Sequence, residues 1–158
     1  MMTMPEQFGI RESDLTEMVV QNDLRAVKIP EDRIMSLLER AGYDGDTLFA
    51  IKLALEEALT NAVKHGNKND RAKRVVVRYH IDPSRVVVAI RDQGNGFRPT
   101  AVPDPTAEEN LERPNGRGIM LMQAYMTRVQ YNEAGNEVWM LKENLCRQDC
   151  PPTPSSPT

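Results

Sequence analysis

The sequence predicts an α+β fold, a two-layer sandwich of a mixed, mainly antiparallel sheet with helices packed on one face. Two observations predict it. Segments with apolar residues at helical spacing come early in the chain, and alternating segments joined by short turns follow in pairs. Hairpins place their strands antiparallel, and the apolar stripe of each helix has to pack against the sheet.

A strand and a helix are expected first. The strand spans about Glu17 to Val27, and after Pro30 a helix follows from about Glu31 to Ala41. Gly42 is suited to end this helix. The apolar residues at helical spacing within it are Ile34, Leu37, Leu38 and Ala41.

A second, longer helix is expected next. Asp44 or Asp46 can cap its first turn, and Gly66 with Asn67 is suited to end it. Its apolar stripe consists of Leu48, Ile51, Leu55, Leu59, Ala62 and Val63.

Two hairpins are expected in the second half. The first consists of two alternating segments on either side of the turn DPS: RVVVRYHI, from Arg74, and RVVVAIRD, from Arg85. The second consists of RVQYN and NEVWMLKE. Between them, residues 93–115 contain four prolines and several acids, which is typical of a long loop. GRGIMLMQAYM begins a third helix at a glycine pair.

Composition bounds the class of protein. The chain has 158 residues, of which 40% are hydrophobic, and a net charge of −3, so we expect one globular domain and no nucleic-acid or membrane partner. No apolar run approaches the roughly 20 residues of a membrane span. The N-terminus lacks the basic start and apolar stretch of a signal peptide, so a cytoplasmic protein is expected.

The two ends of the chain differ from its middle. We expect a flexible N-terminus over residues 1–16, one domain over residues 17–145 and a disordered Pro- and Ser-rich tail over residues 146–158. Cys146 and Cys150 have no second cysteine pair and no histidine nearby, so reduced thiols are expected there rather than a metal site.

An aspartate stands where the second strand of the first hairpin ends. With a period of two, Asp92 falls on the face of Val86, Val88 and Ile90, where an unpartnered charge is costly. A polar residue that ends a strand is one interpretation. The other is a ligand contact, because Gly94 and Gly96 follow and allow a backbone to approach a ligand closely. A buried carboxylate beside such a loop suits a heterocycle with an exocyclic amine, such as adenine.

A second glycine pair, Gly116 and Gly118, stands at the start of the third helix. Free amides and the helix dipole favour phosphates there, although a tight entry into a helix gives the same pattern. On the second helix, Glu57 and Asn61 are four residues apart and share a face. This face is either solvated or catalytic. In the catalytic interpretation, Asn61 is a ligand of Mg²⁺ and Glu57 is a base or an orienting group in γ-phosphate transfer.

Together these motifs resemble a known family. EEALTNAVKHGN, IRDQGNGF and NGRGIMLM resemble the N box and two glycine boxes of the gyrase/histidine-kinase-like ATP-binding family, which has the Bergerat fold. The similarity is strongest to its anti-sigma factor serine kinase branch, whose N box is E-A-x-T-N-A-x-x-H-G. It covers roughly residues 17–143.

The resemblance implies a role for each matching position and makes residues 98–115 the ATP lid. Its implied site consists of Glu57 as catalytic base, Asn61 as Mg²⁺ ligand, Asp92 as acceptor of the adenine amine, Gly94 and Gly96 as the adenine-side loop, Gly116 and Gly118 as phosphate contacts, and Arg113 as a lid contact. Two departures are visible: the final hairpin has Asn136 and Glu137 where the family commonly has a Thr, and RPNGRG is one residue longer before its glycine pair.

The resemblance implies an ATP- and Mg²⁺-dependent serine kinase that binds a sigma factor and phosphorylates a serine of a small antagonist protein, and a homodimer is possible. An ATP-binding partner switch without phosphotransfer is the first alternative. The catalytic domain of a histidine kinase is a weaker one, because those enzymes typically have Asn in place of Glu57, and no phospho-acceptor hairpin fits before residue 17.

Overall fold

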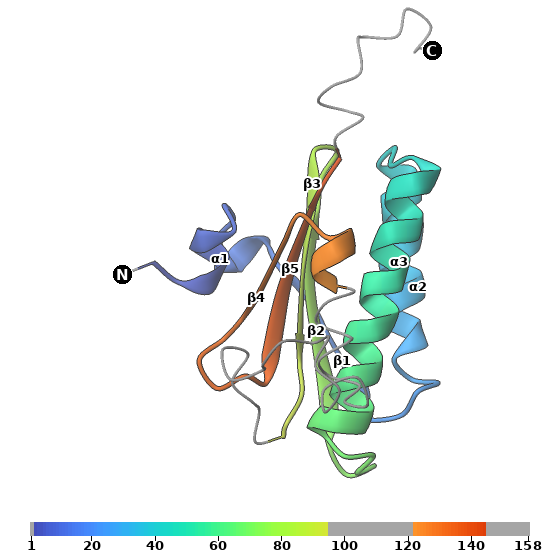
Figure 1. The fold of residues 1–158 in the computed structure, drawn as a ribbon, viewed down its shortest axis with the longest axis vertical. Coiled ribbons are helices and arrows are strands. Elements are labelled where there is room, and N and C mark those ends of the chain that lie inside the picture. The colour runs from blue at the N-terminus through green and yellow to red at the C-terminus, as the bar shows by residue number, and fades with distance from the viewer. Residues whose placement is uncertain (1, 95–121, 145–158) are drawn as a thin grey trace, which may run out of the picture.

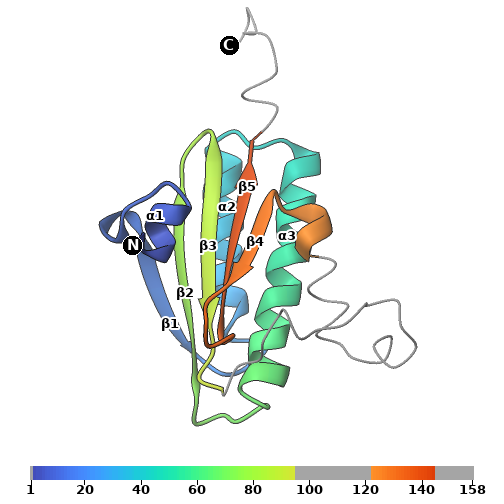
Figure 2. The same ribbon diagram turned by 60° about the vertical axis from the view of Figure 1, so that its left-hand side comes forward.

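The computed structural model describes residues 2–94 and 122–144. Its centre is a five-stranded sheet, with two long helices on one face and the N-terminal segment on the other (Figures 1 and 2). The predicted α+β fold of helices on an antiparallel sheet is confirmed, with a short N-terminal helix added on the second face. The expected lid at residues 98–115 and tail at residues 146–158 lie outside the described residues.

The sheet has the strand order β1-β2-β3-β5-β4, and every pairing between described strands is antiparallel. Both predicted hairpins are present. The first expected strand is shorter than predicted, because the chain turns away from the sheet after Gln21. The strands are β1 (Thr16–Gln21), β2 (Arg74–Ile81), β3 (Arg85–Arg91), β4 (Arg128–Tyr131) and β5 (Glu137–Glu143).

Two long helices, α2 (Lys28–Arg40) and α3 (Gly45–Thr60), lie side by side on the sheet. α2 starts three residues before the predicted Glu31, since Pro30 is tolerated within a first turn, where no helical amide bond is lost. Of the two proposed caps for α3, Asp44 is the one used. Its carboxylate accepts a hydrogen bond from the backbone N–H of Thr47 at 2.8 Å.

The main hydrophobic core lies between these helices and the sheet. The helices direct apolar side chains toward the sheet, and these are almost fully buried, as their spacing predicts: Ile34, Leu38, Ile51 and Leu55. The facing residues of the sheet include Val75, Val77, Val86, Val88 and Met140. Burial of this face fixes the inward register of β3, which matters for the residue that follows it.

A second, smaller core lies on the opposite face. The N-terminal segment contains α1 (Met4–Gln7) and the short helix η1 (Glu12–Asp14), and it places Phe8 and Ile10 over Trp139. The rings of Phe8 and Trp139 have centroids 5.7 Å apart. Trp139 and Met140 are neighbours on β5 and are both buried, because consecutive strand residues point to opposite faces. The N-terminus expected to be flexible therefore has buried contacts that its sequence did not predict.

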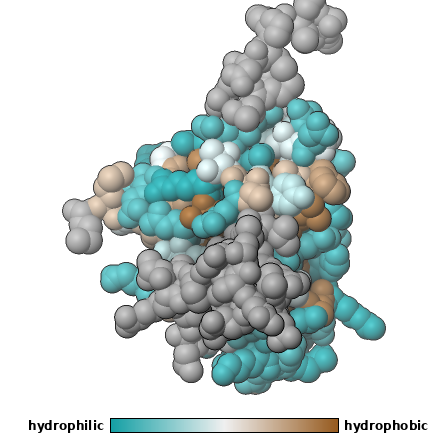
Figure 3. Space-filling model, viewed as in Figure 1, coloured by the Kyte–Doolittle hydropathy of each residue, from teal (hydrophilic) through white to brown (hydrophobic). Residues whose placement is uncertain are grey.

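The described surface offers no large apolar face in the view of Figure 3, where the apolar areas are small and separated by hydrophilic groups. Among the described residues, no helix is both long and apolar enough to cross a membrane.

We predict that Phe8→Ala lowers the free energy of unfolding by about 3–5 kcal/mol, because it removes a buried ring and leaves a cavity over Trp139. Phe49→Ala is the matched control, since Phe49 is 61% exposed and Phe8 only 2%. The control change is expected to stay within about 0.5 kcal/mol. Urea denaturation of the three proteins measures both values, and equal losses would show that the N-terminal segment does not pack on the sheet.

Candidate functional site

The candidate site begins where α3 changes its winding. Glu57 lies in the last turn of α3, and the chain continues as a π-helix, η2 (Asn61–Gly66). The backbone N–H of Asn67 donates to the carbonyl of Ala62, five residues earlier, at 2.8 Å. π-helical turns are rare and are frequent at functional sites. The E-x-x-x-N pair predicted from the sequence therefore stands at the junction of two helix types.

Asn61 has a side chain whose hydrogen-bonding capacity is unused. Its amide oxygen and nitrogen are both shielded from solvent, and neither finds a hydrogen-bond partner in the described part of the chain. A buried amide without partners is costly. This observation fits a group that is completed by a ligand, and a neutral amide oxygen is a suitable ligand for a hard cation.

Glu57, one turn before Asn61, is partly buried. Burial raises the pKa of its carboxyl group, while His65 nearby lowers it. A carboxyl group with a raised pKa is a better proton acceptor near neutral pH than an exposed one. The Glu57 side chain is therefore suited to accept a proton, which a carboxylate on a fully solvated helix face does less well near neutral pH.

Asp92 directly follows β3, as its spacing predicts. Its backbone N–H donates to the carbonyl of Asn136 at 2.9 Å, and its Oδ1 accepts from the N–H of Gly94 at 2.8 Å. Burial raises the pKa of the Asp92 carboxyl group, although the Gly94 hydrogen bond and the charge of Lys73 lower it. Oδ2 accepts no hydrogen bond from the described residues, so it is available to a donor on a ligand.

Two glycines allow this carboxylate to fit. A Cβ added to Gly66 would overlap the Asp92 carboxylate, and one added to Gly94 would overlap the backbone carbonyl of Gly66. Because neither residue has a positive φ, the close approach and not the backbone conformation requires glycine here. The end of η2 and the loop after β3 are thereby brought into direct contact.

Asn67 also belongs to this site. The sequence predicted only that it ends a helix. Its side chain is fully buried. Its Oδ1 accepts from the N–H of Gln93 at 2.7 Å, and its Nδ2 donates to the Asn22 side chain and to the Arg74 carbonyl, each at 3.0 Å. One amide thus joins the ends of β1 and η2, the start of β2 and the residue after Asp92. No periodic pattern signals such a bridge.

Tyr131, at the end of β4, is a second residue that sequence reasoning missed. Burial raises the pKa of its hydroxyl group, and the carboxylates of Asp92 and Glu57 raise it further. Both carboxylates therefore lie near one tyrosine. This places the helix residue and the strand-end residue, 35 positions apart by their numbers, in the same site.

Four predicted site residues, Gly96, Arg113, Gly116 and Gly118, lie outside the described residues, as do Cys146 and Cys150. Within the described ranges, no group of three or more His, Cys, Asp or Glu side chains could hold a metal ion. A bound phosphate group commonly supplies ligands to Mg²⁺ beside the few that come from a protein.

The chain resembles proteins of known family. Residues 20–142 match the family described as Histidine kinase-like ATPase domain. The serine-protein kinase RsbW of Bacillus subtilis is 30% identical over 139 residues, which are 82% of this chain and 86% of that protein. The RsbW of Listeria innocua is 30% identical over 116 residues, 69% of this chain and 74% of that protein.

A solved structure shares the fold. The crystal structure of the RsbU and RsbW domains of Rv1364c from Mycobacterium tuberculosis matches with a TM-score of 0.55 at 15% identity. The match covers 82% of this chain and 32% of the other, so the chain corresponds to about a third of that longer protein.

We predict that Gly66→Ala destabilises the protein by about 1–3 kcal/mol, because the new methyl group displaces the Asp92 carboxylate. Gly45→Ala is the matched control, since a Cβ there meets nothing within 4 Å. This change at the start of α3 is expected to be neutral or to stabilise by up to about 1 kcal/mol. Thermal or urea unfolding measures both, and a neutral Gly66→Ala would contradict the close contact.

Proposed function

The chain belongs to the histidine kinase-like ATPase family, and we propose that it is an ATP- and Mg²⁺-dependent serine-protein kinase of the anti-sigma factor type. The observation that carries the proposal is the partnerless amide of Asn61 one helical turn from Glu57, with Asp92 nearby. The relatives named serine-protein kinase support the phosphotransfer.

Asp92 would recognise adenine. Its Oδ1 is occupied by the N–H of Gly94, and its Oδ2 would accept a hydrogen bond from the exocyclic amine of the base. Gly94, with Gly96 two residues later in the sequence, would leave room for the ring to approach the backbone. A carboxylate is acceptor-only when ionised, so it would favour adenine over a base that presents an oxygen there.

Asn61 would hold the metal. Mg²⁺ binds oxygen and keeps substrate phosphates and water in its shell, so one amide oxygen from the protein is sufficient. The ion, when bound, neutralises charge on the phosphates. Gly116 and Gly118 at a helix start would contact the phosphates, and Arg113 would contact them from the lid. The Asn61 amide, for which the described residues provide no hydrogen-bond partner, fits this role because its oxygen would coordinate the ion.

Glu57 would accept the proton of the attacking serine. Its raised pKa brings it closer to the working pH, and its position one turn before Asn61, the proposed metal ligand, supports a place beside the γ-phosphate. Phosphoryl transfer depends mainly on positioning and charge stabilisation, which this set of residues would supply.

The proposed partners are a sigma factor and a small antagonist protein that carries the target serine. Nucleotide binding and catalysis share most of these residues, so a nucleotide-gated switch without phosphotransfer remains the alternative function. The relatives named serine-protein kinase favour the kinase, and a carboxylate at Glu57 supports it as a candidate base.

We predict that Asp92→Asn abolishes ATP binding. The amide would present a donor or a weaker acceptor to the adenine amine, and a lost charged hydrogen bond in a buried site reduces affinity by about tenfold or more. Asp32→Asn, on an exposed position of α2, is the control. Fluorescence titration of the full chain with a labelled ATP and Mg²⁺ measures the affinity, and wild-type affinity in Asp92→Asn would refute the adenine contact.

We predict that Glu57→Gln lowers phosphotransfer by about 10²–10⁴-fold, the usual contribution of a general base, while ATP binding stays near wild type. Glu56→Gln is the matched control, because Glu56 pairs with Lys28 and Lys52 and not with this site. The readout is transfer of labelled phosphate from ATP to candidate antagonist proteins of the same genome. An unchanged rate in Glu57→Gln would disprove the base, and transfer by no variant, wild type included, would favour the switch.

A further inference from the structure

A cleft of about 520 Å³ lies at the opposite end of β3 from Asp92. It opens beside the turn that joins β2 to β3, and the second half of α2 forms one of its walls. None of the residues that line it belongs to the nucleotide site described above. A role for this cleft is therefore independent of ATP binding.

The cleft exists because two neighbouring strands end at different places. β1 begins at Thr16, which pairs with Tyr79, so none of the described strands pairs with His80 and Ile81 on that side of β2. A strand end without a neighbour offers its backbone N–H and C=O groups to another chain. The open site is short, which favours a segment of a few residues.

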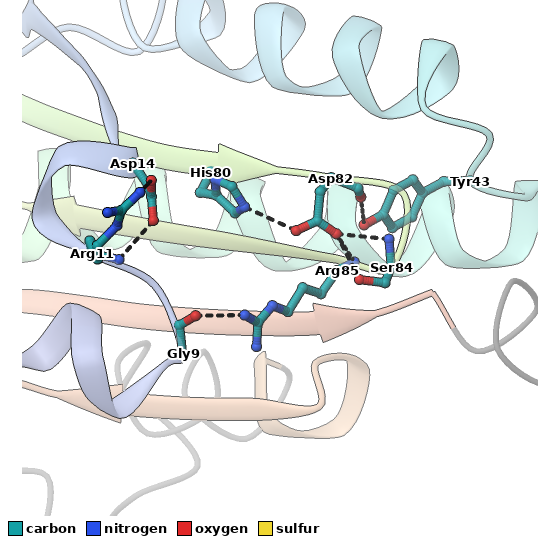
Figure 4. Close-up of polar contacts among 8 residues, drawn as sticks. All are labelled: Gly9, Arg11, Asp14, Tyr43, His80, Asp82, Ser84 and Arg85. Atoms are coloured by element: carbon teal, nitrogen blue, oxygen red, sulfur yellow. Dashed lines mark hydrogen bonds and ion pairs between the residues drawn. The ribbon is translucent and has the colours of Figure 1, made fainter.

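The acidic groups of the cleft are already engaged. Asp82 accepts hydrogen bonds from the Ser84 side chain and from the backbone N–H groups of Ser84 and Arg85 through Oδ1, and contacts His80 Nε2 at 3.0 Å through Oδ2 (Figure 4). Burial raises the pKa of Asp82, but the hydrogen bonds outweigh it and bring the pKa down to about 2. Asp14 accepts from the N–H of Arg11 at 2.8 Å and also pairs with its guanidinium.

The two arginines of the cleft are not engaged by the described residues. Arg33 and Arg40 are exposed on α2, and neither makes an ion pair or a side-chain hydrogen bond with any residue in the described ranges. Seven positions separate them, so they stand on the same face roughly 10 Å apart along the helix. Leu37 lies between them, and Ile81, which is part-exposed, supplies apolar surface across the cleft.

We propose that this cleft is a docking site for an acidic, extended peptide segment of a protein partner. Carboxylates of the segment pair with Arg33 and Arg40, because guanidinium groups bind carboxylates with two parallel hydrogen bonds. Apolar side chains of the segment rest on Leu37 and Ile81. The cleft is open to solvent along its length, which suits a chain segment better than a small molecule that needs enclosure.

A randomised array of heptapeptides, probed with the full-length protein without nucleotide, tests the proposal. Peptides bound by the wild type are expected to be enriched in Asp and Glu, and R33Q/R40Q is expected to lose the enrichment and to bind the best peptide about tenfold or more weakly. R33K/R40K keeps the charges but loses the paired hydrogen bonds, and it is expected to bind with an affinity between those of the wild type and R33Q/R40Q. Arg25→Gln, an exposed arginine outside the cleft, is the matched control and should bind as the wild type does.

Amide chemical shifts in ¹⁵N-labelled protein locate the bound peptide. The expected changes fall on His80, Ile81 and Leu37. An absence of acidic enrichment, or equal enrichment in R33Q/R40Q, would overturn the proposal. Inorganic phosphate producing the same shifts at the same concentration would also overturn it, because the cleft would then be a simple anion site. ATP titration of each variant tests nucleotide binding separately, so a failure of peptide docking can be distinguished from a failure of the proposed kinase function.

Discussion

The partly buried carboxylate of Asp92 is the constraint on which one end of the molecule depends. It follows a strand whose inward residues are apolar, and removing a charge from water is costly unless hydrogen bonds compensate. Among the described residues only the Gly94 N–H donates to the carboxylate. The chain can close around it because Gly66 and Gly94 have no side chains, so the remaining oxygen is left available for a ligand. The free protein thus carries a cost that a hydrogen-bond donor relieves.

The surroundings of this carboxylate are held in place without a ligand. The Asn67 side chain connects three strand ends with the end of η2. The Gln93 side chain accepts a hydrogen bond from the backbone N–H of Arg74 at 2.6 Å. A site whose backbone is fixed before binding loses less conformational freedom when the ligand arrives. Asn67, which follows the E-x-x-x-N pair in the sequence, therefore stabilises the same part of the chain that carries the proposed ligand contact of Asp92.

Much of the fold follows from periodicity, and the parts that do not follow have physical causes. The stripe of Ile51, Leu55 and Leu59 and the alternation of β2 predicted both layers, because burial of a continuous apolar face determines each pattern. The alternation of β3 predicted the phase of Asp92. The packing of Phe8 on Trp139 was not predictable, since a short helix of four residues has too few apolar positions to show a period. The nearness of Tyr131 to Glu57 depends on how separate elements meet, which spacing along one element does not contain.

The π-helix explains how one continuous helical segment can carry both the pair Glu57 and Asn61 and the residues that contact Asp92. In α3 the residues advance about 100° each, so an uninterrupted α-helix would carry Gly66 and Asn67 around to a different side. The wider winding of Asn61–Gly66 includes one extra residue in the turn and changes where the following residues point. Glu57 and Asn61 keep the α-helical spacing that places them on one face, while Gly66 and Asn67 reach the strand end that carries Asp92. The local distortion at Asn61 is thus what joins the two groups of residues into one site.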